Sequence, residues 1–304
     1  MKVFVLLSIL SWRIGCIGLV AQAAKIPATS EQFSCSLLNP QPRQVKPVDD
    51  STLLDAYNSQ VHLIRSLYVA AMVSGGSGKD HDTGDRSREL PGIIKLVKPD
   101  LLRITGVLRL TSSRGFEMTS DGHEFYLLVP ENDKKVVVVG PSDAPAKSKV
   151  PRENLRPQPF LDALRWQEGK LRATAGSEQT GNSDTRTLEI ELPPSRSGAR
   201  TAKVKFDLRG GVVNSLAVYG EAGRLIYEAQ YRGWKEMKAF SEQGPTGCFP
   251  RGIHLVRPDD DYELNLRITE IALNPDIPMS TFRPSPPRGI PVVHVDMSGN
   301  SSER

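Results

Sequence analysis

The clearest pattern in the chain is a series of short apolar runs between Leu90 and Gly140, separated by turn signals. Apolar and polar residues alternate within these runs, so each predicted strand has one apolar face. Asp121-Gly122 lies between two of them, and this dipeptide is a strong signal for a β-hairpin. None of the runs shows the spacing of an amphipathic helix. The pattern predicts an antiparallel up-and-down meander.

The same alternation returns further along the chain. It predicts strands at 187–192, 202–208, 212–219, 225–231 and 262–273. A first strand is also predicted at 68–73, ahead of the meander, and a further pair is predicted to flank 244–247. Helical spacing occurs in two places. One helix is predicted to begin at Ser51 or Thr52 and to carry an apolar stripe that ends at Leu67. A second, shorter helix is predicted at 160–166, after two prolines.

Together these elements predict a mainly β protein of the α+β class, with about ten or eleven strands in one meander. Two helices cover well under half of the apolar face of such a sheet, and large exposed apolar patches are usually functional. We therefore expect a strongly curved antiparallel half-barrel with both helices packed on its concave face and an incompletely filled apolar interior. The alternative is a curled sheet whose own large side chains fill the interior.

The N-terminus has the features of an export signal. Lys2 precedes an apolar run, and an A-x-A-like site ends at Ala23. Two alternatives remain: lipidation at Cys16, which follows a glycine, and an uncleaved anchor, in which Arg13 would be costly. The expected organisation is a signal peptide at 1–23, a Pro-, Gln- and Ser-rich tether at 24–50, one folded domain at 51–295 and a disordered tail at 296–304.

The chain has three cysteines, and cleavage after Ala23 would leave Cys35 and Cys248. In an oxidising compartment these two can form a disulfide that ties the tether to the sheet. The alternative is two free or unrelated thiols, because a sequence does not give the separation of their Cα atoms.

Composition and motifs argue against several functions. A net charge of +4 spread along 304 residues is too small to indicate nucleic-acid binding. The chain contains neither a G-x-S-x-G nor an H-E-x-x-H motif, and its five histidines show no metal-ligand spacing. We expect no catalysis, no metal ion and no cofactor.

Several segments, in this order and spacing, resemble one known family. They are KPDLLRI at 98–104, GFEMTSDGHEFYLLVPENDKKVVVV at 115–139, YEAQYRGWKEM at 227–237 and a long closing stretch at 249–289 that ends in F-x-x-x-x-P-x-G. The chain resembles the LolA/LolB-like lipoprotein-sorting superfamily of bacterial envelopes over approximately residues 51–295.

The resemblance implies a half-barrel in which helices form a lid over an acyl-chain pocket. It also implies a non-catalytic monomer in the periplasm, or at the periplasmic face of the outer membrane. Such a protein binds acyl chains of lipids or lipoproteins during lipoprotein sorting or lipid transfer to the outer membrane. The alternative is a regulatory or scaffold module of the same fold that senses a membrane-protein partner.

The residues expected to line the lipid-binding cavity follow from strand alternation, together with the apolar face of the second helix. They are Leu102, Ile104, Phe116, Met118, Phe125, Leu127, Phe160, Leu164, Leu188, Ile190, Val204, Phe206, Leu264 and Leu266.

A loop between two strands of the meander is a candidate for contact with a membrane surface. In the resemblance it corresponds to a protruding loop of the membrane-associated members. Leu108 and Leu110 alternate there with Arg109, so that a leucine can contact lipid and the arginine a headgroup. The alternative is that both leucines continue the preceding strand.

Overall fold

The computed structural model describes residues 48–77, 89–107, 114–131, 134–142, 156–172, 184–194, 198–237, 247–283, 289–298 and 300–303. The predicted signal peptide, nearly all of the predicted tether, Cys16, Cys35, Leu108 and Leu110 lie outside these ranges. Among the described residues, no helix is long and apolar enough to cross a membrane.

The described part of the chain is mainly β, with two α-helices. The helices are α1 (Asp50–Leu63) and α2 (Gln158–Leu164). The strands of the first half are β1 (Ser66–Ser77), β2 (Leu90–Val97), β3 (Leu101–Val107), β4 (Arg114–Ser120), β5 (Glu124–Glu131) and β6 (Lys134–Pro141). Those of the second half are β7 (Lys170–Leu171), β8 (Thr185–Glu191), β9 (Thr201–Asp207), β10 (Val212–Tyr219), β11 (Leu225–Arg232), β12 (Lys235–Met237), β13 (Gly247–Phe249), β14 (Gly252–Arg257), β15 (Tyr262–Leu273), β16 (Val292–Val295) and β17 (Ser301–Glu303).

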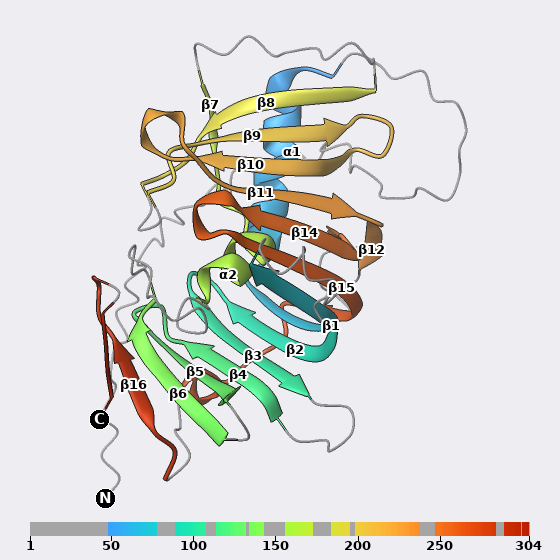
Figure 1. Cartoon of the computed structure of the whole chain (residues 1–304). Coiled ribbons are helices and arrows are strands. Elements are labelled where there is room, and N and C mark those ends of the chain that lie inside the picture. The colour runs from blue at the N-terminus through green and yellow to red at the C-terminus, as the bar shows by residue number, and fades with distance from the viewer. Residues whose placement is uncertain are drawn as a thin grey trace, which may run out of the picture. The chain divides into compact units, whose positions relative to one another are not determined.

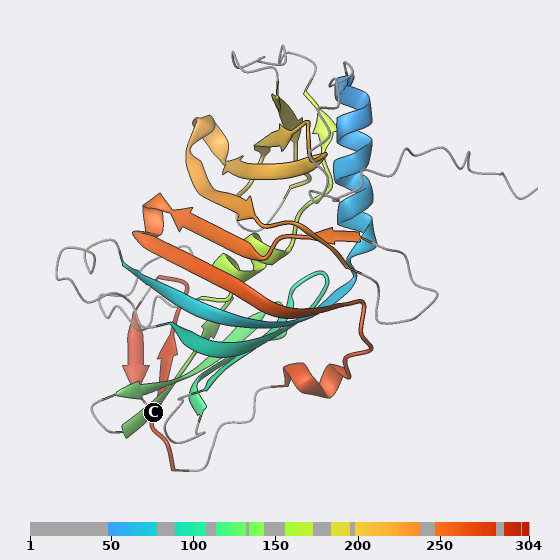
Figure 2. The ribbon, with the colours of Figure 1, turned by 90° about the vertical axis from the view of Figure 1, so that its right-hand side faces the viewer.

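Fifteen of these strands form one large, curved, unclosed sheet (Figures 1 and 2). Its order is β17-β16-β6-β5-β4-β3-β2-β1-β15-β14-β11-β10-β9-β8-β7, and β12 and β13 form a separate hairpin. Two meanders meet in the middle of the sheet, where β1 pairs with β15 and Leu67 lies opposite Leu273. Every neighbouring pair is antiparallel except β16 and β6.

The predicted mainly β class and the curved sheet are confirmed, whereas the single meander of about ten or eleven strands is wrong. The strands that escaped prediction are β7, β16 and β17 in the main sheet, each of two to four residues, whereas the pair expected around 244–247 corresponds to β12 and β13. Segments of two to four residues are too short to show alternation. The segment predicted to be a disordered tail, 296–304, contains β17.

The predicted hairpin at Asp121-Gly122 is confirmed. Gly122 has a φ of +91°, which favours glycine, and it lies between β4 and β5. The Asp121 carboxylate accepts hydrogen bonds from the backbone N–H groups of His123 and Glu124, each at 2.9 Å. These bonds fix the turn and therefore the register of the two strands.

Helix α1 begins and ends earlier than predicted. Its N-cap is Asp49 rather than Ser51 or Thr52, and the Asp49 carboxylate accepts a hydrogen bond of 2.7 Å from the Thr52 N–H. The helix ends at Leu63, so Leu67, the last member of the predicted stripe, belongs to β1. Helix α2 likewise lies two residues before its predicted position.

One apolar cluster runs through both meanders and both helices. Helix α1 contributes the buried side chains of Leu53, Tyr57 and Val61, and it contacts β7 and β13. Helix α2 is buried along its whole length after Gln158 and contacts β14 and β11. Figure 2 shows α1 beside the strands of the second meander.

A second, smaller cluster lies on the opposite face of β5 and β6. Tyr126, Leu128 and Val137 are buried there against Ile290 and Val292, which precede and begin β16. On the other face of β5, Phe125 and Leu127 belong to the main cluster. Strand β5 is therefore apolar on both faces because the C-terminal segment covers one of them.

Candidate functional site

The predicted lining residues are buried in the main apolar cluster. All of them are buried except Phe116, which is half-buried against the same cluster. On three neighbouring strands, Ile104 lies directly opposite Met118, and Met118 lies directly opposite Leu127. The structure thus brings the predicted residues into one continuous apolar interior. Their role in lipid binding stays a prediction.

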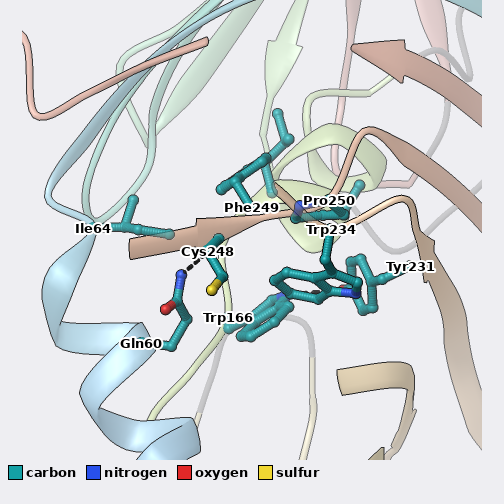
Figure 3. Close-up of a pocket in the computed structure, with 10 residues that line it drawn as sticks. Gln60, Ile64, Trp166, Tyr231, Trp234, Cys248, Phe249 and Pro250 are labelled. Atoms are coloured by element: carbon teal, nitrogen blue, oxygen red, sulfur yellow. Dashed lines mark hydrogen bonds between the residues drawn. The ribbon is translucent and has the colours of Figure 1, made fainter. Parts of the chain in front are cut away.

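A small hollow, with a cavity volume of about 10 Å³, lies between α1, α2 and the β12–β13 hairpin (Figure 3). We use "the hollow" for the space lined by Gln60, Ile64, Ala163, Leu164, Trp166, Tyr231, Trp234, Cys248, Phe249 and Pro250. Pockets for small ligands usually measure about 300–1,000 Å³. The interior expected to be incompletely filled is therefore packed with protein side chains around a small hollow.

Aromatic rings form one side of the hollow. The Trp166 ring stacks on Tyr57 at a centroid distance of 5.6 Å and meets Tyr231 and Trp234 edge-on at 5.1 and 5.7 Å. The Trp166 Nε1–H donates to the Tyr231 hydroxyl at 2.8 Å, and the Trp234 Nε1–H donates to the Val213 carbonyl at 3.1 Å. Both indole N–H groups are thus paired within the protein, and the rings offer an apolar surface.

Sequence reasoning identified only one residue of this hollow, Leu164. It placed Trp166 at the end of the predicted helix at 160–166 without selecting it as a lining residue, and it missed Trp234 because this residue lies outside the alternating part of a strand. Their signal was available in the sequence, since Trp166 ends a predicted apolar helix and Trp234 follows a predicted strand. Cys248 was selected for its thiol and not as a lining residue.

A buried ion pair fastens α2 to the sheet. Asp162 of α2 and Arg257 of β14 are paired, and their side chains are 2% and 13% exposed. The Gln158 side-chain amide also donates to the Asp162 carboxylate at 2.5 Å. Burial raises the pKa of the neighbouring Tyr227 phenol well above its ordinary value, and the Asp162 charge raises it further.

Two basic side chains join both helices to the turn between β2 and β3. The Lys98 ammonium donates to the Val61 carbonyl in the last turn of α1 at 2.5 Å. Arg165, which follows α2, donates to the Pro99 carbonyl at 2.6 Å and pairs with the Asp100 carboxylate. Burial, and to a smaller extent the positive charge of Arg165, lowers the pKa of Lys98 to about 8.

This lowered pKa predicts a pH dependence of stability. In the unfolded chain the Lys98 ammonium keeps its proton up to its ordinary pKa of 10.5. Between pH 8 and pH 10.5 the unfolded state therefore binds more protons than the folded state, and the free energy of unfolding rises with pH. We expect a rise of about 1–2 kcal/mol, since water reaches part of the side chain.

Buried tyrosines oppose the rise at higher pH. Burial raises the phenol pKa of Tyr57 and Tyr231, so that above about pH 10 the unfolded state loses protons that the folded state keeps. Urea unfolding between about pH 7 and pH 11 should show a maximum near pH 10. A Lys98→Met variant should lack the rise and keep the fall. An equal rise in that variant would contradict the assignment.

Cys248 is disulfide-bonded. The other cysteines of the chain are Cys16 and Cys35, and both lie outside the described residues. The Cys248 carbonyl also accepts a hydrogen bond of 2.6 Å from the Gln60 side chain, so the hairpin is held to α1 beside the hollow. The pairing of Cys248 with Cys35 stays a prediction.

The comparisons with known proteins return similar structures only. No family model matches the chain, and no curated protein matches it. An outer membrane lipoprotein-sorting protein domain from Vibrio parahaemolyticus is 11% identical, with a TM-score of 0.45, and the match covers 75% of this chain and 95% of that one. A DUF1329 family protein from Desulfovibrio piger is 14% identical, with a TM-score of 0.46 and coverages of 76% and 94%.

A LolA superfamily protein from Nitrosomonas europaea is 12% identical, with a TM-score of 0.46, and the match covers 78% of this chain and 99% of that one. The chain is similar to these three structures over about three quarters of its length. Since the identities are low, what the protein binds has to be argued from its own residues. Within the described ranges, no group of three or more His, Cys, Asp and Glu side chains is placed to hold a metal ion.

Proposed function

We propose that this protein is a non-catalytic, exported binding protein for the acyl chains of lipids or lipoproteins. It would act in lipoprotein sorting or lipid transfer, in the periplasm or at the periplasmic face of the outer membrane. The observation that carries the proposal is the apolar interior between the sheet and the two helices, with the hollow at the junction of α1, α2 and the β12–β13 hairpin.

Binding would require α1 and α2 to move away from the sheet, because the hollow is too small for a long acyl chain. Helix α2 has only seven residues and is fastened by polar contacts of Asp162, in its last turn, and of Arg165, which follows it; these contacts can exchange with water when the helix moves. Each Å² of apolar surface buried contributes about 25 cal/mol, so an acyl chain that buries a few hundred Å² gains several kcal/mol. The predicted lining residues, from Leu102 to Leu266, would then contact the chain.

The remaining parts of the proposal concern residues outside the described ranges. Residues 1–23 would direct export, with Cys16 lost on cleavage or lipidated. Cys35 would pair with Cys248, as the disulfide at Cys248 supports. Leu108 and Leu110 would contact a membrane surface. Non-reducing mass spectrometry of the mature protein identifies the N-terminus, the modification and the disulfide partner together.

The proposal predicts that an acyl chain quenches the fluorescence of the tryptophans at the hollow. Titration with a bromine-labelled fatty acid should quench Trp166 and Trp234 saturably, because heavy atoms would enter beside their rings. The unbrominated fatty acid of the same chain length is the matched control and should not quench, because Trp166 and Trp234 are the only tryptophans left once residues 1–23, with Trp12, are removed.

Lipid extracted from the purified protein and measured by mass spectrometry is the independent readout. Saturable quenching with co-purified lipid supports the proposal. Absence of both contradicts it. Recovery of one defined membrane protein without lipid, after envelope cross-linking, favours the regulatory or scaffold module instead.

A further inference from the structure

We propose that Lys98 and Arg165 bind the phosphate group of an anionic lipid, so that the preferred ligand is an anionic amphiphile. This inference rests on the proposed function, since it supplies the headgroup site for the ligand whose acyl chains enter the apolar interior. Within the described ranges, these two cations contact only backbone carbonyls and one carboxylate.

The two side chains converge at one place in the fold. Lys98 begins the turn between β2 and β3, and Arg165 reaches the next two residues of that turn, Pro99 and Asp100. The two cations are close enough for the charge of Arg165 to act on the pKa of Lys98. The site is therefore built from three elements: the end of α1, the β2–β3 turn and the end of α2.

Positive charge exceeds negative charge there. Asp100 pairs with Arg165, and among the residues that the structure describes no carboxylate pairs with Lys98. An ammonium has three N–H donors, and that of Lys98 uses one of them, on the Val61 carbonyl. The Arg165 Nε–H is buried and has no acceptor among the described residues. The pair thus has one uncompensated charge and several unused donors.

This arrangement is costly without an anion. Lys98 is half-buried and the Arg165 side chain is 15% exposed, so both cations have lost part of their hydration. A buried charge is normally paired with an opposite charge. The lowered pKa of Lys98 agrees with the lack of such a partner. A phosphate supplies both the charge and several acceptor oxygens, and lysine and arginine are its usual partners.

The site also adjoins the hollow along the chain. Arg165 lies between Leu164 and Trp166, which both line the hollow. Val61, the acceptor for Lys98, follows Gln60, which is another lining residue. A ligand with its chain among the apolar side chains therefore has its polar end within reach of the two cations. This separates a phospholipid from an uncharged lipid with the same chains.

The test compares two short-chain lipids with identical acyl chains, the anionic phosphatidylglycerol and the uncharged diacylglycerol, each titrated below the concentration at which it aggregates and followed by tryptophan fluorescence. Wild type should bind the anionic lipid at least about fivefold more tightly, the ratio for one added charge contact. Lys98→Met should lose most of this preference, and Lys98→Arg should keep it. Lys203→Met, which removes an equal charge from an exposed position on β9, is the matched control and should keep it.

The outcomes separate this inference from the proposed function. Equal affinity of wild type for the two lipids, or an unchanged preference in Lys98→Met, overturns the phosphate site and leaves acyl-chain binding intact. Binding of neither lipid overturns both. If Lys98→Met does not fold, the test uses the ratio of the affinities for the two lipids in wild type and in Lys98→Arg. A ratio of one in both proteins overturns the phosphate site. Inorganic phosphate should compete with the anionic lipid and leave the binding of the uncharged lipid unchanged. If phosphate binds but the protein shows no preference between the two lipids, this result counts against a headgroup site.

Discussion

Replacement of Asp162 by alanine is expected to lower the free energy of unfolding by about 3–5 kcal/mol. The Asp162 carboxylate is 2% exposed and lies between Arg257 and the Gln158 amide. Its removal would leave the Arg257 guanidinium largely buried without its carboxylate, and the loss of an opposite charge is costly at such a site. Because this pair fastens α2 to β14, the helix should also exchange its amide protons faster.

An exposed ion pair provides the matched control. Arg267 and Glu89 are paired at 2.6 Å, but their side chains are 62% and 49% exposed. Glu89→Ala should therefore cost no more than about 1 kcal/mol. Replacing both buried partners with apolar residues, as in Asp162→Leu/Arg257→Met, should recover much of the lost stability. Urea unfolding of the three variants checks this, and a loss below about 1 kcal/mol in Asp162→Ala would contradict it.

Replacement of Trp166 by alanine is the second large effect, with an expected loss of about 3–5 kcal/mol. Trp166 stacks on Tyr57, contacts Tyr231 and Trp234 edge-on, and donates a hydrogen bond to the Tyr231 hydroxyl. Its removal would delete these contacts and enlarge the hollow. If acyl chains bind there, the variant should accept a bulkier apolar ligand although it is less stable.

Two further variants are compared with Trp166→Ala. Trp166→Phe keeps an aromatic ring but loses the hydrogen bond, so we expect a loss of about 1–2 kcal/mol. Leu171→Ala, at an exposed leucine of β7, should change stability by less than about 0.5 kcal/mol. Thermal and urea unfolding give the comparison. Equal losses in Trp166→Ala and Trp166→Phe would show that packing in the aromatic cluster contributes little.

Much of the fold follows from local sequence. Strand alternation located β2 to β6 and β8 to β11, and Asp121-Gly122 located a hairpin, because these features act between neighbours in the chain. The pairing of β1 with β15 had no such signal. The two apolar faces of β5 were also misleading, since Tyr126 and Leu128 are covered by Ile290 and Val292, which are distant in sequence.

The site was less predictable than the fold. Alternation gave the residues of the apolar interior correctly, since it reports which side of a strand is buried. It does not report where the interior is incompletely filled, because that depends on how α1, α2 and the β12–β13 hairpin meet. The same holds for Lys98 and Arg165, whose contacts join segments far apart in the chain.

The pairing in the middle of the sheet has a consequence for how the protein reaches its native state. β1 is among the first strands to be synthesised and β15 among the last, and their contact closes a loop of about 200 residues. Such a large closure slows folding, and until it occurs both strands expose free backbone groups that other chains can bind. A nascent chain of this kind is prone to aggregate, and it should depend on chaperones until its final third has emerged.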